Sequence, residues 1–268
     1  MKITDWAHSK QKFELKTIDR GIYRLSNIPQ DLEAYYNFKD YISHQNEKKT
    51  LTEKIYQFVK KFMFGRKLKV IQQHTNKKNL RILDYGCGVG EFVSYLKNKG
   101  HEAEGFEPNE KARRVALENG VKLIDTLSKE NKYDVICLYH VLEHIEDLDK
   151  KLKQLHQQLN DKGILVIAVP NHDAYDAKHY KTFWAAWDVP RHIWHFNKIG
   201  LKNTIESYSF KLIKTMPLWF DALYISMVSE TFKNSSRLKG LLIGVISNLK
   251  ALLTKNYSSN QFVFKKVK

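Results

Sequence analysis

The sequence predicts a doubly wound α/β protein. Between residues 80 and 170, short apolar segments alternate with amphipathic segments, several of which end at glycine. Strands that alternate with helices in this rhythm form βαβ units and a parallel sheet. The segment 164–169 is apolar without interruption, as expected of a strand that is buried on both faces. We therefore expect a mostly parallel sheet with helices on both sides.

The local patterns place the individual elements. In the central region we expect strands from Leu80 to the first glycine and at 101–107, 121–124, 133–139 and 164–169, and helices at 91–99, 109–119 and 142–159. Before it, residues 28–46 are predicted to form one or two helices and residues 51–73 a longer amphipathic helix. After it come a helix at 199–208, a strand at 210–216, a helical region at 219–255 and a final alternating strand, QFVFKKVK.

Length and composition exclude several classes of protein. The 268 residues, 43% of them apolar, suit one large domain, with or without an appendage, and exclude a mostly disordered chain. Apolar runs are far shorter than the ~20 residues of a membrane span, and no secretion signal is expected. Two cysteines, Cys87 and Cys137, cannot form a disulfide framework, so we expect reduced thiols in a cytoplasmic protein.

The charge of +16 lies in the two flanks of the chain. Residues 1–80 and 171–268 carry a net +9 each, whereas residues 81–170 carry −2. Basic flanks attract nucleic acid, an anionic membrane or an acidic substrate, and a plain lysine-rich surface looks the same. The lysines are scattered without a dense arginine cluster, which does not favour nucleic acid.

The sequence DYGCGVG is the most informative segment. It lies where a strand becomes a helix, and glycines there let the backbone approach a ligand closely. Glu107 follows Gly86 by 21 residues at the end of the next strand, where a carboxylate accepts hydrogen bonds from ribose hydroxyls. Glu91 replaces the third glycine of a dinucleotide fingerprint. Asp84, before the turn, suits a cofactor with ammonium and sulfonium cations rather than phosphates.

These residues carry a resemblance to a known family. RILDYGCGVGEF resembles the first motif of the class I S-adenosylmethionine-dependent methyltransferases, and GFEPNEKA, KYDVICLYHVLEHIED, LNDKGILVIAVPN and PRHIWHF agree in order. The resemblance spans about 28–268 and is strongest to ubiquinone-biosynthesis O-methyltransferase-like proteins. It implies a seven-stranded Rossmann-like sheet whose last strand is antiparallel. We therefore divide the chain into an N-terminal segment with a helical cap at 1–79 and a methyltransferase domain at 80–268, with insertions at about 171–200 and 217–256.

The resemblance also implies contacts to S-adenosyl-L-methionine. Those beside its methionine part and sulfonium would be Asp84, Gly86, Cys87, Gly88, Tyr139 and His140. Those beside its ribose and adenine would be Phe106, Glu107, Pro108 and Asp125. Many relatives begin with a cysteine-rich zinc knuckle, which this chain lacks, so we predict no structural zinc.

Histidines are the candidates for catalysis. Methyl transfer to a hydroxyl is helped by a base, and histidine is the usual choice near neutral pH. We favour His144, with His192 next, over His140, His195 and His44. A plain structural role remains the alternative for each of them. The spacing of His140 and His144 also fits a metal site, but without the H-E-x-x-H form we predict no metal.

The acceptor stays open between several classes. We expect O-methylation of a small molecule, and the alternatives are methylation of RNA or protein, or a catalytically silent cofactor-binding module. Tyr35, Tyr36 and Tyr41, together with the segment 187–196, would form a lid over the acceptor or a packed second core.

A helix near the C-terminus carries a wide apolar stripe of Leu238, Leu241, Leu242, Val245, Ile246, Leu249, Leu252 and Leu253, flanked by cations. That stripe needs burial in the protein's own core, in a homodimer or on an anionic membrane. We therefore expect a monomer or a homodimer. We expect the protein to be cytoplasmic, with peripheral attachment to the membrane as one option.

Overall fold

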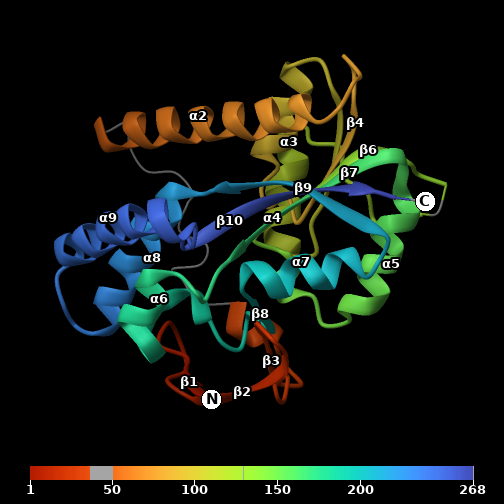
Figure 1. The fold of residues 1–268 in the computed structure, drawn as a ribbon. Coiled ribbons are helices and arrows are strands. Elements are labelled where there is room, and N and C mark those ends of the chain that lie inside the picture. The colour runs from red at the N-terminus through yellow and green to blue at the C-terminus, as the bar shows by residue number, and fades with distance from the viewer. Residues whose placement is uncertain (37–50, 129, 268) are drawn as a thin grey trace.

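The computed structural model describes residues 1–36, 51–128 and 130–267, and its centre is a six-stranded sheet (Figure 1). The strand order is β5-β4-β6-β7-β10-β9. The bounds are β4 Arg81–Tyr85, β5 Glu102–Phe106, β6 Tyr133–Tyr139, β7 Leu159–Pro170, β9 Phe210–Pro217 and β10 Ser259–Lys266. Strands β4 to β7 pair in parallel, and β10 is antiparallel to both β7 and β9, as predicted for the last strand.

The predicted strand count of seven differs from this sheet. Residues 121–124 lie beside β5 but make only an isolated parallel bridge, Gly105 to Leu123. The Gly105 N–H donates to Lys122 O, and the Ile124 N–H donates to Gly105 O, both at 2.9 Å. The chain then turns away at Asp125, so the edge pairing is one residue long and does not form a strand.

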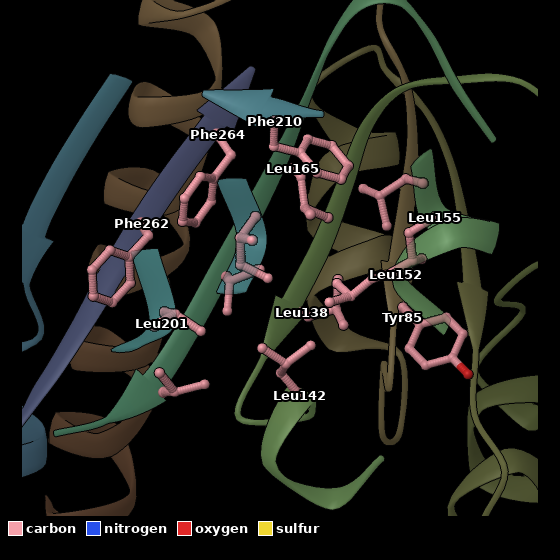
Figure 2. Packing of buried hydrophobic residues seen from close by; sticks show 14 of the residues in the cluster. Tyr85, Leu138, Leu142, Leu152, Leu155, Leu165, Leu201, Phe210, Phe262 and Phe264 are labelled. Atoms are coloured by element: carbon pink, nitrogen blue, oxygen red, sulfur yellow. The ribbon is translucent and has the colours of Figure 1, made fainter. Parts of the chain in front are cut away.

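Helices cover both faces of the sheet. α2 (Leu51–Gln73), α3 (Glu91–Asn98) and α4 (Glu110–Glu118) cover one face, and α5 (Leu148–Gln158) and α7 (Lys198–Glu206) cover the other. Alternate residues of a strand enter opposite cores: Cys137 packs on the first side, and Leu138 on the second. Figure 2 shows the second core, where Leu152 and Leu155 of α5 face the sheet.

The predicted helix 142–159 is interrupted. A short 3₁₀ turn, η2 (Leu142–His144), precedes α5, which begins only at Leu148. The Asp147 side chain accepts a hydrogen bond from the Lys150 N–H at 3.0 Å and is the N-cap of α5. His140 and His144 therefore do not lie on one face of a helix.

The N-terminal segment begins with strands, at residues where the sequence predicts neither a helix nor a strand. β1 (Lys2–Thr4), β2 (Lys12–Asp19) and β3 (Ile22–Leu25) form an antiparallel sheet, and β8 (Trp194–Phe196) joins it beside β3. The 3₁₀ turn η1 (Glu33–Tyr36) follows, and the predicted helix beyond it, with Tyr41 and His44, lies outside the described residues. β2 pairs with β1 and β3, and β3 pairs with β8, which lies about 170 residues further along the chain.

The predicted lid segment is largely a packed core. α6 (Tyr175–Tyr180), η3 (Lys181–Phe183) and η4 (Ala185–Trp187) precede β8, and Trp184, Trp187 and Ile193 are buried with Leu15 of β2. The second insertion forms a helical hairpin of α8 (Trp219–Phe232) and α9 (Arg237–Thr254) between β9 and β10. In the part of the chain that is described, no helix is both long and apolar enough to cross a membrane.

Candidate functional site

The glycine turn joins β4 to α3 at the carboxyl edge of the sheet. Gly86 and Gly88 have φ of 81° and 55°, a region that side chains disfavour. A Cβ on Gly86 would lie 2.3 Å from Val141 Cγ2, whereas a Cβ on Gly88 would meet nothing within 4 Å. The N–H groups of Gly86 and Cys87 both donate to Phe106 O, at 2.7 and 3.0 Å. The turn is therefore held against β5 and open at Gly88.

Glu107 is held by the backbone of the same region. Its two carboxylate oxygens accept from the N–H groups of Gly88 and Asn109, both at 2.8 Å. The side chain is buried, and burial raises its pKa although the two amides oppose that shift. The carboxylate thus has a fixed position beside the open side of the turn.

The other predicted adenine and methionine residues lie nearby or at the surface. Phe106 stacks on Tyr85, with ring centroids 4.6 Å apart. Burial raises the pKa of the Cys87 thiol to about 12, so it stays neutral. Pro108 is exposed. Asp125 is exposed and forms an ion pair with Arg113, so its contact with adenine stays a prediction.

Lys67 is a residue that sequence reasoning missed. It comes from α2, and its Nζ lies 3.5 Å from the centroid of the Tyr139 ring and 5.2 Å from that of Phe92. Burial lowers the pKa of Lys67, and nearby Asp84 opposes the shift. Burial also raises the pKa of Asp84 to about 6. No local pattern marks Lys67, because its role depends on the packing of α2 over the ends of β4 and β6.

These features fit the predicted cofactor. The face of Tyr139 already contacts a cation, and a buried carboxylate lies close by, as ammonium and sulfonium groups require. Glu107 would supply the acceptor for the ribose hydroxyls, and the open side of Gly88 would leave space for the methionine part. Lys67 would have to leave the Tyr139 face when a cationic ligand binds there.

His140 lies at the end of β6 in a left-handed conformation, with φ of 56°. Its Nε2 is 3.0 Å from Asp221 Oδ2 on α8, and its Nδ1 is 3.5 Å from Glu143 Oε1. Burial alone would lower the pKa of His140, but the two carboxylates outweigh it and raise the pKa to about 10. His140 is therefore a cation at neutral pH and does not serve as a base.

His144 and His192 lie together, with ring centroids 4.7 Å apart. His144 Nδ1 is 2.9 Å from Arg191 O and 3.0 Å from Tyr36 Oη, and His192 Nδ1 is 2.9 Å from Ala186 O. A carbonyl only accepts, so each Nδ1 donates, and in a neutral His144 the lone pair is therefore on Nε2. Burial and the neighbouring His192 lower the pKa of His144 to about 4, so it is neutral.

We call His140, Glu143, His144 and His192 the histidine cluster. Glu143 is buried, and although burial favours its neutral form, the surrounding histidines lower its pKa. Glu143, His144 and His192 each offer a ligand atom within 4.8 Å of the others, so by distance they could hold a metal ion. His195 is buried beside Trp187 and burial holds its pKa well below the usual range, so it belongs to the packed core.

The N-terminal sheet supports this cluster through Arg191. The guanidinium is 1% exposed and contacts Asp5 at 3.0 Å and Asp188 at 2.6 Å. It also donates to Tyr35 O at 3.1 Å. Since Arg191 O holds His144, Asp5 in the first residues of the chain helps to position the candidate base.

The family and the fold agree with the sequence prediction. The family model described as a methyltransferase domain matches residues 56–215. The ubiquinone biosynthesis O-methyltransferase of Rickettsia canadensis (strain McKiel) is 27% identical over 206 residues, which are 73% of this chain and 80% of that protein.

Two solved structures share the fold at 19% identity. The phosphoethanolamine N-methyltransferase 2 of Haemonchus contortus, in complex with S-adenosyl-L-methionine, matches 77% of this chain and 53% of its own, with a TM-score of 0.53. A SAM-dependent methyltransferase from Archaeoglobus fulgidus matches 77% and 94%, with a TM-score of 0.52. The family model covers more than half of the chain, so this protein belongs to the methyltransferase domain family, and the predicted class I S-adenosylmethionine-dependent methyltransferase is confirmed.

Proposed function

We propose that this methyltransferase transfers a methyl group from S-adenosylmethionine to a hydroxyl of a small molecule. The observation that carries the proposal is the orientation of His144. Its Nδ1 is committed to Arg191 O, and its Nε2 lone pair is left in the histidine cluster after the carboxyl end of β6. The O-methyltransferase named among the relatives, at 27% identity, supports oxygen as the methylated atom.

Two groups of residues would have different roles in the reaction: one would bind the cofactor, and the other would act on the acceptor. S-adenosylmethionine supplies an electrophilic methyl group on its sulfonium. Glu107 would bind its ribose, the Gly86–Gly88 turn its methionine part, and Asp84 its amino group. His144 Nε2 would accept the proton of the acceptor hydroxyl as the oxygen bonds to the methyl carbon, and the methyl–sulfur bond would break to leave a neutral thioether. The low pKa of His144 keeps this nitrogen unprotonated at neutral pH.

Replacing His144 with Gln tests the proposal. Gln keeps a donor for Arg191 O but has no basic nitrogen, so turnover at saturating acceptor should fall by about 100-fold or more, within the usual range for general-base catalysis. The assay would follow labelled methyl groups into a panel of alcohols and phenols, with amines and RNA as comparison. His156→Gln, a surface histidine on α5, is the matched control. Unchanged turnover, or transfer only to amines or RNA, would contradict the proposal.

A further inference from the structure

The α8–α9 hairpin has an unusual distribution of side-chain sizes. The side of α9 that packs on α8 and the core includes the small residues Gly240, Gly244, Ser247 and Ala251, all buried. A Cβ on Gly240 would lie 2.5 Å from Met227 Cα, and one on Gly244 would lie 2.7 Å from Leu223 Cα. The two helix backbones are therefore in close contact, a packing that small residues permit.

The large apolar residues of α9 point outward. Leu253 is 89% exposed, Leu238 77% and Leu242 59%, and the same stripe contains Leu241, Val245, Leu249 and Leu252, all of them exposed. Ile246 is the one member of the predicted stripe that is partly buried against the core. A helix that covers a protein core normally buries its leucines, so the protein's own core does not cover this stripe.

The charges on α9 have a single sign. Arg237, Lys239 and Lys250 are exposed, Lys255 follows at the C-cap, and the helix contains no Asp or Glu. Exposed aromatic residues, Trp219, Phe220 and Tyr224, lie on the neighbouring α8. An apolar stripe flanked by cations, with aromatics beside it, is the pattern of a helix that lies in a membrane interface.

Charge decides between a membrane and a second copy of the chain. In a symmetric pair the α9 helices would bring only cations together, and α9 offers no carboxylate to balance them. An anionic lipid surface provides the opposite charge and buries the leucines at once. We propose that the exposed face of α9 docks this protein on an anionic lipid bilayer.

Docking on this face brings the bilayer to the side of the molecule that carries the site. Asp221 of α8 lies 3.0 Å from His140, so the hairpin connects directly to the histidine cluster. Figure 1 shows α8 and α9 together at one side of the molecule, beyond one end of β10. The docking itself does not depend on which acceptor is methylated.

Vesicle co-sedimentation of the full chain tests the proposal. We expect binding to phosphatidylcholine vesicles that contain about 30% phosphatidylglycerol, at least about tenfold weaker binding to pure phosphatidylcholine, and loss of binding in high salt. Leu242→Ser with Leu249→Ser should abolish binding. Leu117→Ser with Ile199→Ser, which alters two exposed apolar residues elsewhere, should leave it intact. Arg237→Gln with Lys250→Gln should weaken it by about tenfold.

Three outcomes would overturn the proposal. Absence of binding to the anionic vesicles at low salt would do so, as would equal binding to neutral vesicles. A concentration-dependent dimer in sedimentation equilibrium that Leu242→Ser with Leu249→Ser dissociates, without vesicle binding, would assign the face to a second copy. All these side chains are exposed, so circular dichroism should report unchanged folding for every variant.

Discussion

The predicted cofactor side of this candidate site takes its residues from one short stretch of the chain, and the histidine cluster takes them from distant parts. The cofactor side takes Asp84, the glycine turn and Glu107 from one βαβ unit, and backbone N–H groups within it hold the carboxylate. The histidine cluster takes its residues from the end of β6, from η2 and from the segment before β8. Asp221 of α8 contacts it, and the N-terminal sheet positions it through Asp5. The first side depends on local chain geometry, and the second on long-range packing.

Asp5→Asn should give the largest effect, and it should act on one side alone. The variant removes a charge partner of the buried Arg191, while Asp188 remains, so we expect a loss of about 3 kcal/mol of unfolding free energy. Turnover should fall because Arg191 O no longer holds His144 in place, and the affinity for S-adenosylmethionine should stay unchanged. Chemical denaturation, a methyl-transfer assay and calorimetry measure the three quantities.

Glu33→Gln is the control for that variant, since Glu33 is an exposed acid in η1, also N-terminal to α2. It should change none of the three quantities. Weakened cofactor binding in Asp5→Asn would show that the two sides are coupled, which would contradict the comparison.

Glu107→Ala should act on the predicted cofactor side, and so on the affinity for S-adenosylmethionine. Loss of the carboxylate removes a hydrogen bond to a charged group, which should weaken S-adenosylmethionine binding by about 1.5–3 kcal/mol in calorimetry. Binding of NAD should be absent in the parent protein and in the variant. Glu102→Ala, on the exposed start of β5, is the control. An unaltered affinity would mean that the ribose is held elsewhere.

More of the geometry of the first side than of the second could be predicted from the sequence. The glycine turn and Glu107 were identifiable because their partners lie within about 25 residues. The N-terminal sheet was not predicted, since β3 pairs with β8 from a distant part of the chain. Lys67 and Asp5 were missed for the same reason: each has its role only after distant elements pack. The two histidines were predicted, but only the structure places them in contact.

His140 should give a smaller effect, on the pH dependence of stability, because its side chain is 39% exposed and solvent screens its charge partners. Its pKa rises from an ordinary value near 6.5 to about 10 in the folded protein, so its contribution to stability is complete below about pH 6.5 and is lost as the pH rises through about 10. The unfolding free energy should therefore decline between those values. Asp221→Asn removes one of the two carboxylates and should flatten the decline, as urea titrations at several pH values would measure. Equal slopes would mean that His140 is not a cation in the fold.

Removal of metal ions should have no effect on the activity. Glu143, His144 and His192 are close enough to hold an ion, but the Glu143 carboxylate already has cationic His140 at 3.5 Å, and a metal would have to compete with that charge. Activity after treatment with EDTA and gel filtration should equal that of the untreated enzyme, and added Mg²⁺, Mn²⁺ or Zn²⁺ should not raise it. A metal-dependent enzyme would lose activity and regain it with one of these ions. In that case His144 would be a ligand rather than a base, since one lone pair on Nε2 cannot serve a metal and a proton together.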